Sequence, residues 1–204
     1  MGFDLNKCYS HPGKLLKVHL ENVALSSKRF TSSDAAELVS LFHDIGKVNP
    51  NFQQKLDGLC PKGYDHHAYL SAYAFFMYLI KNPDMFKALV PHGFNSNNYL
   101  ISLITIVAKH HGDLPDMMPN GDNSILSSYE VSNLYAFLDK NHISFGNVFS
   151  ELLGNEPSMP SSMEEDRIRL FFKRIVNLPN DYNVALPFYL EIQSIFSALI
   201  KAEI

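Results

Sequence analysis

The sequence lacks several features that mark common classes of protein. It contains no tryptophan and two cysteines, Cys8 and Cys60, which do not have the spacing of a metal site. Both thiols are therefore expected to be reduced, as in the cytoplasm. No apolar run approaches the ~20 residues that cross a bilayer. The first residues show no basic region followed by an apolar stretch. These absences predict a cytoplasmic protein without a membrane segment or a signal peptide.

The chain also lacks an excess of positive charge, with 17 Lys and Arg residues, 21 Asp and Glu residues and a net charge of −4. Proteins that bind nucleic acid unaided usually carry a basic excess, because neutralising phosphates supplies affinity. We therefore expect any nucleic-acid substrate to be held by bound metal, by a local basic patch or by a partner. No Gly-x-x-x-x-Gly-Lys-Ser/Thr segment is present, which predicts no ATPase activity in the chain itself.

The chain does have an apolar content of 46%, and no repeat or linker divides it, so we expect a single domain over residues 1–204. Gly and Pro separate segments with helical periodicity, and no segment shows the alternation of strands. The predicted fold class is all-α, a helical bundle around one core. We expect helices at residues 14–24, 33–45, 65–82, 99–111, 124–139, 145–153, 162–176 and 186–204, with a helical turn ending near residue 90 and a loop at residues 48–64.

The segment 33–45 shows the helical pattern clearly. Its apolar residues follow the i, i+3, i+4, i+7 spacing: Leu38, Leu41, Phe42 and Ile45. Ser33 or Asp34 is expected to cap its start. Gly46 follows where a helix end favours left-handed backbone. The segment 99–111 is apolar on nearly all sides, so we expect it to form a buried central helix.

Five of the nine histidines lie in adjacent pairs near predicted helix ends, which are His43-Asp44, His66-His67 and His110-His111. The dipeptide His43-Asp44 lies in the last turn of the predicted 33–45 helix, and its carboxylate could bridge two cations. Taken alone, a histidine near a helix end is more often a packed or capping residue. The pair His110-His111 extends two apolar ridges of the central helix into the core. Buried imidazoles need partners, which are either backbone carbonyls or a bound metal.

Three further side chains lie on apolar helix faces: His19, His67 and Glu203. A lone histidine on such a face is more often a satisfied core residue, and for Glu203 a solvated helix end is the simpler interpretation. As a set, however, five helices direct a His, Asp or Glu towards one region. Such a set can form two metal sites that share one carboxylate. Two cations about 4 Å apart suit the in-line displacement of a phosphoester.

The order of these residues resembles the HD superfamily of metal-dependent phosphohydrolases. The matching segments are His19, His43-Asp44-Ile45-Gly46-Lys47, Phe52-Gln53, His67-Ala68, Ser71-Ala72 and His110-His111-Gly112. The Phe-Gln pair, the His-His-Gly and the opening Pro12-Gly13-Lys14-Leu15 resemble one branch more closely. That branch is the HD nuclease subunit or domain of the CRISPR type I helicase-nuclease.

The resemblance implies an HD-domain helical bundle around a two-metal site. The first metal position would be formed by His19, His43, Asp44 and Glu203. The second would be formed by Asp44, His67, His110 and His111. The family has an aspartate where this chain has Glu203. Asp44 and Lys47 would be the catalytic residues, with Lys47 contacting the scissile phosphate, or else lying at the surface as a helix-end cation.

The resemblance further implies hydrolysis of single-stranded DNA with divalent cations such as Mn, Mg, Ni or Co. The implied partners are a CRISPR helicase subunit and a guide-RNA surveillance complex. Two alternatives remain open. The same metal positions would serve an HD phosphohydrolase acting on nucleotides or small phosphomonoesters. The glutamate at position 203 would also suit a non-enzymatic docking or regulatory module.

Overall fold

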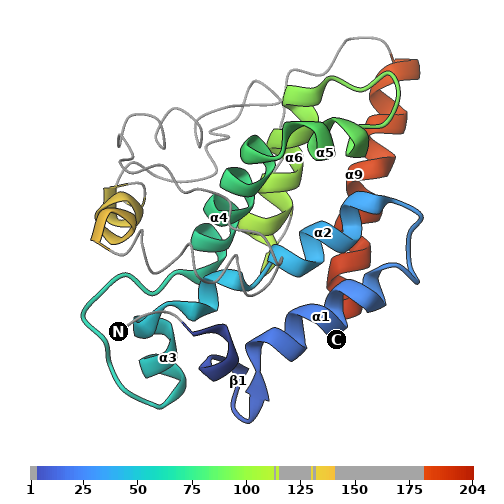
Figure 1. The fold of residues 1–204 in the computed structure, drawn as a ribbon. Coiled ribbons are helices and arrows are strands. Elements are labelled where there is room, and N and C mark those ends of the chain that lie inside the picture. Colours follow the sequence, from blue (N-terminus) through green and yellow to red (C-terminus); the bar gives the residue numbers. More distant parts are fainter. Residues whose placement is uncertain (1–3, 113, 115–129, 131, 141–181) are drawn as a thin grey trace.

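A computed structural model describes residues 4–112, 114, 130, 132–140 and 182–204 (Figure 1). Its elements, in chain order, are η1 (Leu5–Lys7), β1 (Tyr9–His11), β2 (Lys14–Leu15), α1 (Leu16–Ser27), α2 (Asp34–Phe42), η2 (Ile45–Val48), α3 (Pro50–Leu56), α4 (His67–Lys81), α5 (Pro83–Leu89), α6 (Ser96–Lys109) and α9 (Tyr182–Glu203). Residues 132–140 are also helical. The all-α fold class is confirmed. The helices predicted at residues 145–153 and 162–176 lie outside the described residues.

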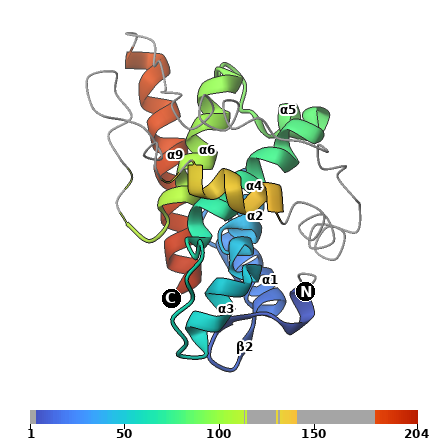
Figure 2. The same cartoon turned by 90° about the vertical axis from the view of Figure 1, so that its left-hand side faces the viewer.

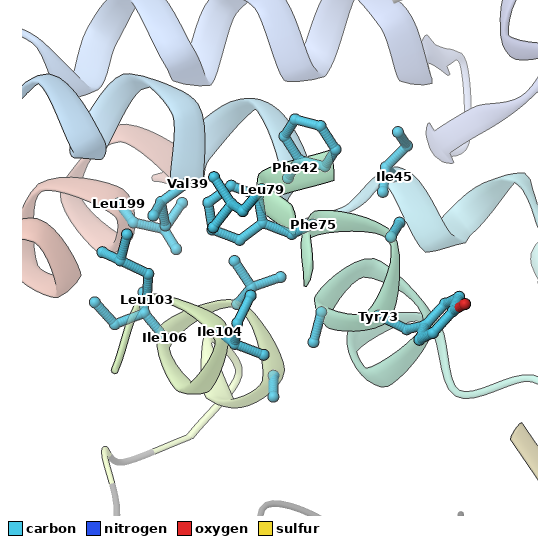
Figure 3. Close-up of a cluster of buried hydrophobic side chains, with 14 of the residues drawn as sticks. Val39, Phe42, Ile45, Tyr73, Phe75, Leu79, Leu103, Ile104, Ile106 and Leu199 are labelled. Carbon is cyan, nitrogen blue, oxygen red and sulfur yellow. The ribbon is translucent and has the colours of Figure 1, made fainter. Parts of the chain in front are cut away.

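The core forms where α2, α4, α6 and α9 meet. Figure 3 shows Phe42 of α2, Phe75 of α4, Ile104 of α6 and Leu199 of α9 converging, and all four are fully buried. Burying one such side chain contributes about 1.5–3 kcal/mol. Every residue of α6 from 98 to 108 is buried, as expected for a central helix. The C-terminal end of α6 therefore leads from the core to His110, which is also buried.

The long helix α9 lies alongside α1, α2 and α6 (Figure 1). It begins at Tyr182, earlier than predicted, and contains Pro187 within it. The β1–β2 hairpin and α3 lie at one end of the molecule, and α5 lies towards the other (Figure 2). No helix in the described residues is long and apolar enough to cross a membrane.

The chain around Gly46 differs from the prediction. Helix α2 ends at Phe42, so His43 and Asp44 lie in the turn after it, before η2. The left-handed backbone predicted for Gly46 is wrong, because the positive φ angles of the described residues occur at other glycines. Gly46 instead lies against α4, where a Cβ atom would overlap the carbonyl oxygen of His67. The position therefore requires glycine for close approach of two backbones.

The short elements that were not predicted include the β1–β2 hairpin and helix α3. The strands β1 and β2 form an antiparallel hairpin whose turn contains Gly13, with φ 79°. Helix α3 lies inside the predicted loop at residues 48–64. It begins at Pro50, and the Asn49 side chain accepts a hydrogen bond from the Asn51 N–H. Both elements lie next to the functional residues described below.

Candidate metal centre

The carboxylate of Asp44 is fully buried, and four imidazoles face it from different parts of the chain. Its Oδ2 lies 3.2 Å from His19 Nε2 and 3.4 Å from His43 Nε2. Its Oδ1 lies 3.2 Å from His67 Nε2 and 3.4 Å from His110 Nε2. The two oxygens of one carboxylate therefore face two different pairs of histidines.

The potential ligand atoms form two groups, and the atoms of each group all lie within 4.8 Å of one another. We call the first group the inner cluster; it contains His19, His43, Asp44 and Glu203. We call the second group the outer cluster; it contains Asp44, His67, His110 and His111. These are the two sets that the resemblance implied, and the fold brings every member of both sets together.

Backbone carbonyls orient two of the rings. His43 Nδ1 lies 2.6 Å from the Ser40 oxygen, and His110 Nδ1 lies 2.7 Å from the Val107 oxygen. A carbonyl only accepts, so Nδ1 donates and the neutral ring carries its lone pair on Nε2. Both Nε2 atoms and Asp44 Oδ1 are buried without a hydrogen-bond partner. Each such atom costs about 1–3 kcal/mol, and a cation among them would remove that cost. The residues present therefore fit a metal.

The inner cluster is closed to solvent except at one side chain. His19 and His43 are fully buried, with ring centroids 5.2 Å apart. His19 extends the buried stripe of α1 formed by Leu16, Leu20 and Val23. Glu203, in the last turn of α9, is 18% exposed, and its Oε1 lies 3.9 Å from His43 Nε2. The glutamate therefore reaches the inner cluster.

The outer cluster opens to solvent through His111. The prediction that His111 extends a ridge into the core is wrong, because α6 ends at Lys109 and His111 is exposed. Its Nε2 nevertheless lies 2.8 Å from His67 Nε2. Partial enclosure of the His111 ring and the neighbouring His110 lower its pKa to about 4, and burial lowers the pKa of His67. Both rings are therefore neutral near pH 7, as metal ligands must be.

Asp44 stays ionised despite its burial. Burial alone would raise the pKa of this carboxyl, but the charge of His43 and the contacts with His110 and His19 hold it well below its usual range. Burial lowers the pKa of His43, yet the Asp44 carboxylate raises it on balance. Asp44 thus keeps its negative charge in the core, next to ring nitrogens that have no hydrogen-bond partner.

Lys47 is buried, which contradicts the surface position considered for it. Its side chain is almost fully enclosed, and Nζ lies 2.6 Å from Asp44 Oδ2. The same ammonium lies 5.6 Å from the centre of the Phe52 ring. Lys47 therefore places a fixed positive charge beside the carboxylate oxygen that also faces the inner cluster.

Several contributors to the site were not predicted. The Gly46 N–H donates to Ser71 Oγ at 2.8 Å, which joins the turn after Asp44 to α4. The His11 ring lies edge-on to His19, with centroids 5.5 Å apart, at the border of the inner cluster. Ser71 belongs to a matched motif, so the sequence contained a signal for it. His11 had no such signal, because its position depends on the unpredicted hairpin.

A cleft of about 370 Å³ adjoins the outer cluster. His67 and His111 form part of its wall, and Phe52 lies edge-on to His67 with ring centroids 4.7 Å apart. Another part of the wall is built by Tyr69 and Lys109. The Lys109 Nζ lies 3.3 Å from the Tyr69 hydroxyl and 5.3 Å from its ring centre. The cleft thus presents aromatic rings and an ammonium beside the proposed ligands.

A His-Asp centre built at helix ends in an all-α bundle defines the class of HD metal-dependent hydrolases. Comparison with protein families matches residues 12–133 to the family described as Cas3, HD domain. The chain belongs to this family, the HD-type nuclease domain of CRISPR type I systems. No curated protein and no solved structure matches the chain.

Proposed function

We propose that the chain is a nuclease that hydrolyses phosphodiester bonds of single-stranded DNA with two divalent cations, such as Mn, Mg, Ni or Co. The observation that carries this proposal is that the two oxygens of buried Asp44 face two separate groups of ligand atoms. Two cations held by one carboxylate suit the in-line displacement of a phosphoester. The proposed ligands are His19, His43, Asp44, His67, His110, His111 and Glu203.

Each residue has a defined task in this proposal. The histidines act as neutral ligands, because the backbone carbonyls occupy Nδ1 of His43 and His110 and leave Nε2 free. When bound, the divalent cations would lower the pKa of water and neutralise charge on the phosphate. Asp44 would contribute a carboxylate oxygen to each of the two groups of ligand atoms. Lys47, whose ammonium touches Asp44, is assigned to the scissile phosphate.

The cleft beside the outer cluster supports a single-stranded substrate. Phe52, His66 and Tyr69 line it, and aromatic side chains stack on bases without regard to sequence. Such stacking contributes about 1–3 kcal/mol per base in alanine-substitution experiments. Lys109, which lines the same cleft beside Tyr69, can contact a phosphate. Within a duplex the bases are already stacked on one another, so this wall favours an unpaired strand.

A partner is proposed to deliver that strand. The net charge of −4 gives the chain little affinity for DNA at long range, and the sequence has no ATP-binding segment that could unwind a duplex. We therefore assign unwinding to a CRISPR helicase subunit and target selection to a guide-RNA surveillance complex. The location consistent with such a complex is the cytoplasm.

The deciding experiment is cleavage of circular single-stranded DNA by the purified chain. Cutting should require Mn²⁺, Mg²⁺, Ni²⁺ or Co²⁺, stop with chelator and disappear in Asp44→Ala. The control is Asp84→Asn, because Asp84 is exposed on α5, towards the opposite end of the molecule. A folded wild-type protein that cuts no circle with any of these cations contradicts nuclease activity of the isolated chain.

The second candidate function is hydrolysis of nucleotides or small phosphomonoesters. The cleft of about 370 Å³ beside the same ligands favours it, because a small phosphate ester could enter there. Turnover of mononucleotides without cleavage of the DNA circle would select this function. The proximity of Glu203 to His43 weakens the motivation for a non-enzymatic docking module, since the glutamate joins the inner cluster.

A further inference from the structure

The side chain of Gln53, on α3, ties together two segments that carry proposed metal ligands. Its Oε1 accepts a hydrogen bond from the Tyr9 N–H at 2.9 Å. Its Nε2 donates to the Tyr9 carbonyl at 2.9 Å and to the Lys47 carbonyl at 2.6 Å. Both amide protons and the amide oxygen are therefore used, which holds the side chain in one orientation.

On one side, Gln53 completes the edge of the hairpin. In an antiparallel ladder a residue exchanges both its N–H and its carbonyl with one partner, and the Gln53 amide makes both bonds to Tyr9. Just before β1, the Cys8 carbonyl accepts from the Leu16 N–H, at the start of α1, at 2.8 Å. The second strand continues directly into α1, and the first turn of α1 carries His19.

On the other side, Gln53 holds the turn that carries Asp44. The Lys47 carbonyl belongs to η2, the short helix that follows Asp44 directly, and the Lys47 ammonium contacts the same carboxylate. One amide therefore links the backbone leading to His19 with the backbone leading from Asp44. The atoms that these two backbones bring together, His19 Nε2 and Asp44 Oδ2, are 3.2 Å apart.

We propose that Gln53 is a positioning residue of the metal centre: its three hydrogen bonds set the distance between His19 and Asp44 and so shape the inner cluster. The inference rests on the proposed function, since it assigns the inner cluster to a cation. Gln53 lies outside both ligand groups and acts through the backbone of its neighbours. Without its amide, the hairpin and η2 lose their shared anchor, and His19 no longer has a fixed separation from the carboxylate.

The test compares Gln53→Glu with Gln54→Glu by calorimetric titration with Mn²⁺. Gln53→Glu keeps the size of the side chain but turns an oxygen towards the Tyr9 and Lys47 carbonyls. Gln54 is exposed on the same helix, so its variant makes the same change of charge away from the contact. His19 belongs only to the inner cluster, so the Mn²⁺ ion whose binding weakens in His19→Ala is the ion of the inner cluster. That equivalent should bind at least about tenfold more weakly in Gln53→Glu, the range found for residues that orient ligands.

The outer equivalent and the Gln54→Glu variant should retain wild-type affinity. Equal weakening of both equivalents would assign Gln53 to general stability and overturn the inference. If Gln53→Glu fails to fold, Gln53→Met, which removes the bonds without adding charge, is measured in the same way. Unchanged affinity in a variant that folds would also overturn the inference.

A second readout needs no metal. The NMR resonances of the His19 ring in metal-free protein should shift in Gln53→Glu and keep their positions in Gln54→Glu. Should the wild type bind no Mn²⁺, these resonances decide the role of Gln53, and the failure falls on the metal proposal alone. A protein that binds two Mn²⁺ ions but cuts no DNA contradicts the nuclease and leaves the role of Gln53 intact.

Discussion

The side chain of Asp44 concentrates the chemistry of this protein at one residue. Its carboxylate is buried, ionised and surrounded by imidazoles, and the Lys47 ammonium contacts one of its two oxygens. A buried charge without partners is costly, so metal-free protein depends on these neighbours to keep Asp44 ionised. Lys47 thus stabilises the centre when no cation is present.

Replacement of Lys47 tests whether its ammonium stabilises the buried Asp44 carboxylate in the metal-free protein. Lys47→Met removes the ammonium and keeps the volume, so the metal-free protein should lose about 3 kcal/mol of unfolding free energy. Mn²⁺ should restore most of that loss, because a divalent cation supplies the missing charge beside Asp44. The measurement is chemical denaturation with chelator and with Mn²⁺. Lys55→Met is the control, because the exposed Lys55–Asp65 pair should contribute only about 0–1 kcal/mol. Equal stabilisation of Lys47→Met and wild type by Mn²⁺ would contradict the prediction.

The shared position of Asp44 gives a second prediction at this scale. Asp44→Asn should abolish binding of both Mn²⁺ equivalents, because both clusters lose a charged ligand together. His111→Ala should weaken only the outer equivalent, since His111 belongs to one cluster and is exposed. Calorimetric stoichiometry distinguishes the two cases. Retention of one tight equivalent in Asp44→Asn would show that Asp44 does not join the two positions.

At the scale of elements, the long helices were predictable and the short elements were not. Helices α2, α4 and α6 each bury one face or all faces in the core. Their apolar residues therefore follow a helical spacing that can be recognised in the sequence. Helix α3 buries no residue fully, so it has no apolar stripe to detect. The strands of the hairpin have three and two residues, too few for alternation to appear.

Many of the site residues lie at helix ends, where residue spacing predicts the side-chain direction less well than it does within a helix. The family resemblance implied both groups of residues, and the structure brings the members of each group together. The exposure of His111 could not be predicted, since its inward spacing assumed a helix that continues past Lys109. The conformation of Gly46 was likewise hidden, because a glycine after a helix serves equally for left-handed backbone and for close approach.

Gly46 provides the prediction for this scale. In Gly46→Ala the new Cβ would overlap the His67 carbonyl oxygen and lie 2.9 Å from the Ser71 nitrogen. The turn after Asp44 and α4 must then separate, which should cost about 1–3 kcal/mol of unfolding free energy and weaken metal binding. Urea denaturation measures the cost. In Gly112→Ala the nearest atom is 3.9 Å away, so this control should remain within about 0.5 kcal/mol of wild type.

At the scale of the whole molecule, the proposed ligands come from α1, the turn after α2, the start of α4, the end of α6 and the end of α9. A cation that joins these elements binds the folded state and not the unfolded chain. It should therefore stabilise the fold by about 2.7 kcal/mol at a concentration one hundred times its Kd. Above the Kd, the melting temperature should keep rising with the logarithm of the free Mn²⁺ concentration, with a slope set by two bound ions, and should fall again with chelator. A slope that corresponds to one bound ion would contradict the two-cation proposal.

Glu203 joins α9 to the inner cluster. Its carboxylate lies in the last turn of α9, whereas the other three members of the inner cluster come from α1 and from the turn after α2. Helix α9 packs against both α1 and α2. In the proposed mechanism, a molecule in which α9 has moved away from α1 and α2 would lack one ligand of the inner cluster. The affinity for the inner cation would therefore report whether α9 is docked.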